Sequence, residues 1–266
     1  MNRNGVVKVL IAILCAMGAC SAQSDVCRAT DADANSIDSI LQKLREKTSR
    51  LHSYQCNINY LFSQPLLESQ TLKTGVLYYV KSAGGPAADQ SKLRINFETL
   101  KQDDEPEKKY IEHYIFDGQW LTQIDYQIKQ VKRRQLAEPN EPIDAFELAR
   151  RNFPIIGFTK TEDLKEQFEI TLAEPNKNEP AELVLLRLKV KPDSIYKDDY
   201  KTVDFWIDKR LSLPAKIIAV STEEDIYQID LTGAKADEPI DKKVFDFTIP
   251  DGFSEPEVIP LRKESK

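Results

Sequence analysis

Cysteine is the residue type in this sequence with the clearest capacity for covalent chemistry. Cys15 and Cys20 lie in an apolar N-terminal stretch, which leaves Cys27 and Cys56 further along the chain. In an oxidising compartment such a pair predicts a disulfide, closing a loop of about 30 residues and worth about 3.5 kcal/mol in the chain-entropy model. Two unpaired thiols are the alternative.

The other groups that could do chemistry form no catalytic pattern. His52 and His113 are the two histidines, expected at the end of a helix and within a strand. Carboxylates gather in "QDDEPE", "STEED" and "KPDSIYKDD", but none has the Gly and terminal Glu of a twelve-residue EF-hand loop. The sequence contains no HExxH, CxxC, GxSxG, Walker or dinucleotide-binding motif. We therefore expect a protein that is not an enzyme and has no metal site and no cofactor.

The N-terminus has the pattern of a secretory signal peptide. Arg3 and Lys8 accompany the apolar run "VLIAILCAMGAC", which is followed by small residues. At about ten to fourteen residues the run is shorter than the twenty or so that a membrane-spanning helix needs. We expect cleavage after Ala22 and a periplasmic protein. The alternative is that "MGAC" acts as a degenerate lipobox, so that an acylated Cys20 anchors the protein to a membrane.

Charge excludes one class of partner. Removal of residues 1–22 takes away two basic residues and leaves 35 basic against 43 acidic residues. Nucleic-acid binding normally needs a basic face, so nucleic acid is not expected as a partner. The content of 41% apolar and 30% charged residues is typical of an ordered globular chain.

The elements that would position any site begin with one helix. Residues 36–51 carry apolar side chains at helical spacing: Ile37, Ile40, Leu41, Leu44 and Leu51. Asn35 or Ser36 can cap its start. The single apolar stripe indicates that this helix lies against an apolar surface.

The rest of the chain is mainly strands, about ten or eleven in number. Those with the clearest pattern are "YQCNINYLFSQ", "GVLYYVKS", "KLRINFETL", "FEITLAE", "AELVLLRLKVKP", "KTVDFWIDK", "LPAKIIAVS", "DIYQIDLTG" and "KVFDFTIP". Helices are expected within 140–154 and 159–167. We predict a flexible lead over 23–35, one mainly β domain over 36–260 and a tail over 261–266. So many short strands favour a strongly curved antiparallel sheet or barrel.

The segment from Tyr114 to Arg134 raises a question about the interior of that sheet. It reads as paired strands with a tight turn at Asp117 and Gly118, and it is rich in large apolar side chains. The interior of a curved sheet must be filled by side chains or by an apolar ligand. Ordinary core packing is the simpler of these two interpretations.

The order of several motifs resembles the LolA-like family of outer-membrane lipoprotein carrier and sorting proteins. The motifs are "GVLYYVK" (75–81), "LRINF" (93–97), "IFDGQWL" (115–121), "DFWID" (204–208) and "VFDFTIPDGF" (244–253). The resemblance covers most of residues 36–260. It implies a half-open antiparallel β-barrel, α+β but mainly β, covered by a few helices that act as a lid.

The resemblance also implies a function. A LolA-like carrier holds the acyl chains of a lipoprotein in its apolar cavity and moves them from an inner-membrane release complex to an outer-membrane acceptor. We therefore expect a monomeric carrier of an acylated lipoprotein or another lipid. The residues expected to line its cavity are Tyr79, Phe97, Phe116 and Trp120 from the strands and Ile40 and Leu44 from the helix.

One position departs from the family pattern. Family members often have an arginine after the "VK" of the early strand, where it latches the lid, whereas this chain has Ser82. Arg94 is the residue that could take over the latch. The alternative function is a LolA-like sensor or protein-binding module, soluble or membrane-tethered, that shuttles no lipid.

Overall fold

A computed structural model describes residues 36–81, 91–138, 161–174 and 180–261 of the chain. Within these ranges, two α-helices and two short 3-10 helices accompany one large sheet. None of the helices in the described ranges combines the length and the apolar character needed to cross a membrane. The expected signal peptide, the predicted lipidation site Cys20 and the helix predicted within 140–154 lie outside the described residues.

Helix α2 (Ile37–Arg50) forms where the apolar stripe predicted it. Ser36 is its N-cap, and the Ser36 hydroxyl accepts a hydrogen bond from the Ser39 amide at 3.2 Å. Asp38 lies in the first turn and Arg50 in the last, as the helix dipole favours. The second helix, α4 (Thr161–Gln167), confirms the prediction for 159–167.

The sheet contains twelve strands among the described residues. They are β1 (Ser53–Gln64), β2 (Ser69–Lys81), β3 (Ser91–Gln102), β4 (Lys108–Phe116), β5 (Trp120–Asp125), β6 (Gln130–Gln135), β7 (Phe168–Ala173), β8 (Leu183–Val190), β9 (Tyr200–Asp208), β10 (Leu213–Ser221), β11 (Ile226–Ala236) and β12 (Glu257–Ile259).

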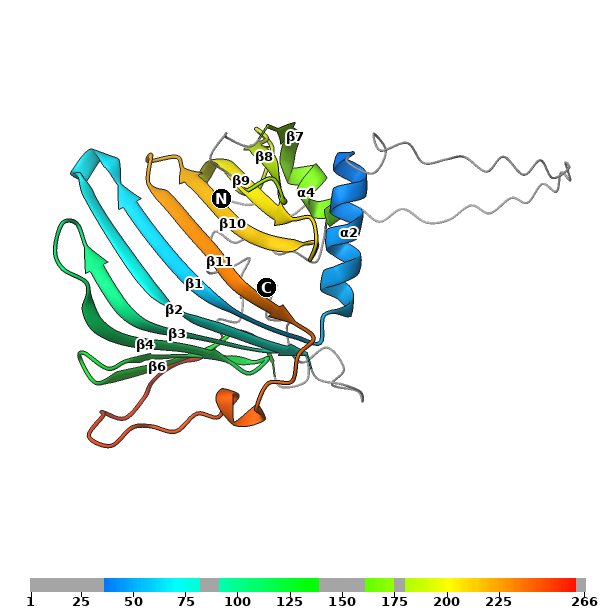
Figure 1. Cartoon of the computed structure of the whole chain (residues 1–266). Coiled ribbons are helices and arrows are strands. Elements are labelled where there is room, and N and C mark those ends of the chain that lie inside the picture. The colour runs from blue at the N-terminus through cyan, green and yellow to red at the C-terminus, as the bar shows by residue number, and fades with distance from the viewer. Residues whose placement is uncertain (1–35, 82–90, 139–160, 175–179, 262–266) are drawn as a thin grey trace, which may run out of the picture.

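Their order is β12-β6-β5-β4-β3-β2-β1-β11-β10-β9-β8-β7, so β1 pairs with β11 and joins the two halves of the sheet. All pairs are antiparallel except β12 with β6. The ends of the order, β12 and β7, do not pair with each other, so the sheet is open. Figure 1 shows long, bent strands that curl from β7 to β6, with α2 across one end of them. The fold class expected from the sequence, a mainly β, half-open antiparallel sheet with few helices, is confirmed.

The bend of β2–β4 coincides with irregular pairing. The register shifts between Thr74 and Gly75 in the β2–β3 pair and between Phe97 and Thr99 in the β3–β4 pair. Gly75 is required there because a Cβ atom at this position would lie 1.9 Å from the backbone oxygen of Asn96. Such bulges bend and twist a sheet.

The C-terminal segment corrects one sequence prediction. "KVFDFTIP" was expected to be a strand because its apolar residues alternate, but residues Lys242–Phe245 form the 3-10 helix η2. The segment then crosses the outside of the sheet, where Phe247 and Phe253 pack near Ile115, Ile124 and Val131. The segment leads into β12, a strand that the sequence pattern did not indicate.

Candidate ligand-binding face

The candidate site is the face of the sheet against which α2 packs, which we call the inner face. Side chains of a strand point alternately to the two faces. Ile58 of β1, Ile95 of β3 and Phe205 of β9 all belong to the apolar cluster that includes Leu41 and Leu44 of α2. These five side chains are 0–4% exposed. The inner face therefore carries a continuous apolar surface across both halves of the sheet.

Helix α2 is held on the inner face by apolar contacts and by an ion pair near each end. Leu41 and Leu44 are 2% and 0% exposed, respectively. Near the start of the helix, Lys165 Nζ lies 2.5 Å from Asp38 Oδ1; near its end, Lys47 Nζ lies 2.7 Å from Asp237 Oδ2. Exposed ion pairs contribute at most about 1 kcal/mol each, so burial of the leucines dominates.

Electrostatics at the end of the helix favour the ionised form of Asp237. Burial opposes ionisation, but hydrogen bonds from Lys47 and from the backbone amide of His52 outweigh it and lower the pKa of Asp237. The Asp237 carboxylate thereby ties the last turn of α2 to the end of β11.

Two hollows lie beside α2, both of them against the edge strand β7. One of about 380 Å³ lies between Ile40 and the edge strands β7 and β8, where Leu172, Leu183 and Val184 line it. Another, of about 480 Å³, is lined by Ile37, Phe168 and Ile170 among others. Small-molecule sites commonly have volumes of about 300–1,000 Å³. There is thus space beside the helix as well as core beneath it.

The inner face changes from apolar to polar with distance from α2. Strand β1 starts just after the helix, and Tyr79 of β2 pairs with Tyr54 at that end. Along β2 the inner-face residues are then Leu77, Gly75 and Lys73, the last paired with Tyr60. At about 3.3 Å per residue, Lys73 lies roughly 20 Å along the strand from Tyr79.

The neighbouring strands repeat this gradient. In β4 the sequence of inner-face residues is Phe116, Tyr114 and Glu112, and in β5 Leu121 pairs with Phe116 and Gln123 with Tyr114. Phe116 is fully buried, whereas Tyr114 is partly exposed. The inner face is therefore amphipathic, with an apolar end under α2 and a polar end away from it.

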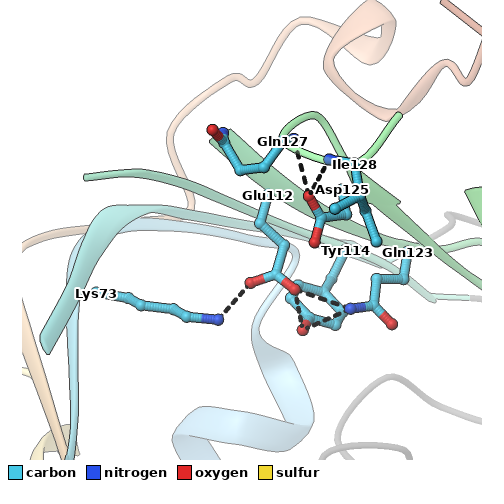
Figure 2. A network of polar contacts seen from close by, with 7 residues as sticks. All are labelled: Lys73, Glu112, Tyr114, Gln123, Asp125, Gln127 and Ile128. Carbon is cyan, nitrogen blue, oxygen red and sulfur yellow. Dashed lines mark hydrogen bonds and ion pairs between the residues drawn. The ribbon is translucent and has the colours of Figure 1, made fainter. Parts of the chain in front are cut away.

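A buried ion pair lies at the polar end. Glu112 is 3% exposed, and its Oε2 atom lies 2.5 Å from Lys73 Nζ. The Tyr114 hydroxyl and Gln123 Nε2 each donate to Glu112 Oε1 at 2.8 Å (Figure 2). Burial, and next the Glu112 charge, raise the pKa of Tyr114, which keeps its hydroxyl a donor. We call these four residues the Lys73–Glu112 network.

Most of the predicted lining residues lie on the inner face. Tyr79, Phe97 and Phe116 are 0–3% exposed there, and Ile40 and Leu44 of α2 pack in the same apolar cluster as Phe97. Tyr79 and Phe116 belong to a second cluster with Leu51, so all of these side chains are core residues. Their predicted contact with an acyl chain stays a prediction.

Trp120 lies on the opposite, outer face. Its neighbour Leu121 pairs with Phe116 on the inner face, so Trp120 points the other way. There its ring lies 5.0 Å from the Arg133 guanidinium. Trp120 is therefore not part of the lining. The sequence could not show this, because both faces of β5 carry apolar residues and alternation does not say which face is inner.

Arg94 also lies on the outer face, which corrects its predicted role as a lid latch. Its Nη1 atom donates to the backbone oxygens of Val244 at 2.7 Å and Asp246 at 3.2 Å. The guanidinium thus holds the C-terminal segment on the side of the sheet away from α2. The cause is strand parity, since its neighbour Ile95 points to the inner face.

His113 is predicted to make stability depend on pH. Burial first, and then the charge of Arg94, lower the pKa of His113 to about 4, and its Nδ1 atom lies 3.1 Å from Arg94 Nη2. The unfolded chain takes up this proton near the usual pKa of about 6.5, so stability is lost as the pH falls from there toward 4.

We expect His113→Gln to remove part of that loss. Between pH 7 and pH 5 the free energy of unfolding, measured in urea, should fall by about 1 kcal/mol less in the variant, after allowance for solvent screening. His52→Gln is the control, since the His52 side chain is 75% exposed. Equal pH dependence of wild type and His113→Gln would contradict the prediction.

The cysteine predictions fall partly outside the described residues. Cys56 is buried on β1 and has no disulfide partner among the described residues, and burial raises the pKa of its thiol to about 12. Its predicted partner Cys27 lies outside the described ranges, so the disulfide stays a prediction.

Sequence reasoning missed Lys73, Glu112 and Gln123. Each lies on a strand where a single polar residue is usually solvent-facing. The alternation "K-x-G-x-L-x-Y" from Lys73 to Tyr79 places Lys73 on the same face as two apolar residues, and this was the available signal. Glu112 follows it by 39 positions. Only the strand register brings the two together.

Comparisons with known proteins give similar folds. No protein-family model and no curated protein matches the sequence. An uncharacterised conserved protein from Thermus thermophilus is 10% identical with a TM-score of 0.46, and the match covers 84% of this chain and 98% of that one. MucB, from the Pseudomonas aeruginosa MucA/MucB complex, is 12% identical with a TM-score of 0.43, covering 79% of this chain and 60% of that one.

A third similar structure is a LolA superfamily protein from Nitrosomonas europaea. It is 16% identical with a TM-score of 0.33, and the match covers 79% of this chain and 97% of that one. These similarities are too low to transfer an activity, so the function proposed below depends on the residues of this chain. In the order of its motifs and in the architecture of its open, helix-covered antiparallel sheet, the chain is similar to the LolA-like family.

Proposed function

We propose that the protein is a periplasmic carrier that holds the acyl chains of a lipoprotein or another lipid against its inner face, for transfer toward the outer membrane. The observation that carries the proposal is the amphipathic inner face under a helix held mainly by apolar contacts. Burial of each methylene of an acyl chain contributes about 0.8 kcal/mol, so such a surface can retain a hydrocarbon tail. In this proposal the protein binds and releases its ligand without chemical catalysis.

Movement of α2 would connect binding to release. The helix packs on the inner face through Ile40, Leu41 and Leu44 and leaves hollows between itself and the edge strands β7 and β8. A tail entering from a hollow would take over contacts that these side chains make in the structure. Displacement of a lid of this kind is a common way to gate a site.

The alternative function is a module, soluble or membrane-tethered, that binds a protein partner and shuttles no lipid. Near-complete burial of Leu41 and Leu44 favours it, because the helix fills that part of the inner face with the protein's own side chains. An acylated N-terminus at Cys20 would also favour it, since a tethered protein cannot diffuse between membranes.

The test is native purification of the protein from the periplasm, followed by organic extraction and mass spectrometry. We expect acylated molecules in the extract, and Leu77→Gln should lower their amount several-fold because Leu77 contributes to the inner-face clusters. Val76→Gln is the matched control, since the adjacent side chain points to the outer face. The same spectra give the mature N-terminus, which separates cleavage after Ala22 from lipidation of Cys20.

Two outcomes would overturn the carrier proposal. One is a wild-type extract with no acylated molecules above the background of an unrelated periplasmic protein. The other is an equal loss of ligand in both variants at equal stability in urea.

A further inference from the structure

The Lys73–Glu112 network is unusual because it places a largely buried ion pair on a face whose other end is apolar. Glu112 is 3% exposed and the Lys73 side chain 20% exposed. Desolvation of two charges usually offsets their attraction, and apolar replacements of a buried ion pair are often as stable or more so. Fold stability alone therefore gives little reason for a lysine and a glutamate at this end of the inner face.

Lys73 retains hydrogen-bonding capacity that the described residues do not use. An ammonium group has three N–H donors, and Glu112 Oε2 is the acceptor that the described part of the chain supplies to it. The rings of Tyr110 and Phe97 flank Lys73 Nζ at 5.1 and 5.8 Å from their centroids. These rings contact the ammonium group but offer its remaining donors no conventional hydrogen-bond acceptor.

Local charge selects against an anionic partner. Glu112 already neutralises Lys73, and Asp125 is the direct cross-strand neighbour of Glu112 in the β4–β5 pair (Figure 2). Lys132, the cross-strand neighbour of Gln123, is itself paired with Glu257 at 3.8 Å. Three carboxylates therefore accompany two ammonium groups around the network, and the local balance is negative. A phosphate or free carboxylate would meet repulsion here, whereas an uncharged acceptor would not.

We propose that the Lys73–Glu112 network binds the uncharged ester or amide carbonyl that links an acyl chain to its headgroup. This inference rests on the proposed function. It adds the chemical class of the ligand and the orientation in which the ligand lies on the inner face. The acyl tail lies along the apolar residues from Leu77 toward Tyr79 and α2, and its carbonyl oxygen accepts a hydrogen bond from Lys73. The recognised chemistry is an acylglycerol-type linkage or an N-acyl linkage, as in an acylated lipoprotein.

The experiment compares three single-chain probes on the delipidated mature protein by calorimetric titration below their micelle concentrations. Monopalmitoylglycerol carries the ester carbonyl, 1-O-hexadecylglycerol lacks it, and palmitate is anionic. We expect monopalmitoylglycerol to bind about tenfold more tightly than either of the others, the typical effect of one hydrogen bond to a charged donor. A fourth probe, N-palmitoylglycinamide, should bind as the ester does, since it also presents an uncharged carbonyl.

Variants assign the preference to the network. Lys73→Met/Glu112→Gln removes both charges, leaves no buried unpaired ion, and keeps an acceptor for Tyr114 and Gln123. We expect it to bind all probes with equal affinity. Lys216→Met is the matched control: Lys216 Nζ likewise lies 5.2 Å from the centroid of an aromatic ring and 3.8 Å from a carboxylate oxygen, but on the outer face. It should keep the tenfold preference.

The outcomes separate this inference from the proposed function. Equal binding of all probes by the wild type, or a preference that survives in Lys73→Met/Glu112→Gln, would overturn the role of the network while leaving acyl-chain binding intact. Tighter binding of palmitate than of the ester would overturn the charge argument in the same way. No binding of any probe would overturn both proposals.

Discussion

Leu44→Ala is expected to lower the free energy of unfolding by about 2–5 kcal/mol, because Leu44 is fully buried where α2 meets the inner face. Removal of its branched side chain leaves a cavity between the helix and the sheet, which the neighbouring side chains of Ile40 and Leu41 do not fill. Urea denaturation measures the loss. The same variant should expose the inner face more often, which faster amide hydrogen exchange in α2 would report.

The control for that prediction is Glu46→Ala on the exposed side of the same helix. Glu46 accepts a hydrogen bond from Gln42 on the helix surface, and its removal should change the free energy of unfolding by no more than about 0.5 kcal/mol. A loss below about 1 kcal/mol for Leu44→Ala would show that packing against the sheet does not hold the helix in place.

Gly75→Val should have the largest effect of any single substitution considered. Even the first added carbon would lie 1.9 Å from the Asn96 backbone oxygen and 2.8 Å from Phe97 Cα. No side-chain rotation relieves a contact with backbone, so β2 and β3 must separate at the bend. We expect a loss of more than about 3 kcal/mol, or a chain that does not accumulate in folded form.

Gly252→Ala distinguishes this steric effect from the general cost of replacing glycine. Gly252 has a φ of +77° with no atom within 4 Å of an added Cβ, so its replacement should cost only about 1–2 kcal/mol. Thermal unfolding of the two variants side by side, with Gly75→Ala as an intermediate, gives the comparison. A Gly75→Ala protein as stable as Gly252→Ala would mean that the sheet accommodates the side chain by a small shift.

Local patterns in the sequence were sufficient to predict most of the helices and strands. The stripe from Ile37 to Leu51 predicted α2 with Ser36 as one of its two candidate caps, and alternation predicted β1 and β3 near their observed ends. Strand β2 was predicted only in its second half, since it begins at Ser69 and not at Gly75. Asp117 and Gly118 predicted the tight β4–β5 turn, where Gly118 has a φ of +100°. These signals succeed because side-chain direction within one helix or strand depends only on its own backbone.

The same reasoning failed where a segment is stabilised by distant residues. The alternation in "VFDFTIP" is that of a strand, yet its backbone oxygens at Val244 and Asp246 accept hydrogen bonds from Arg94, about 150 positions away. Phe247 packs on the outer face instead of within a strand pair. No local pattern contains that partner.

Residue patterns along the chain were thus enough to establish one amphipathic helix, many alternating strands, and the sets of residues that share a face. Which face is inner emerged only in three dimensions, where Phe116 is separated from Trp120 and Lys73 lies against Glu112. Both sides of β4 and β5 carry large apolar residues, so alternation alone does not say which side is inner. Only long-range pairing, such as β1 with β11, and the docking of α2 remove that ambiguity.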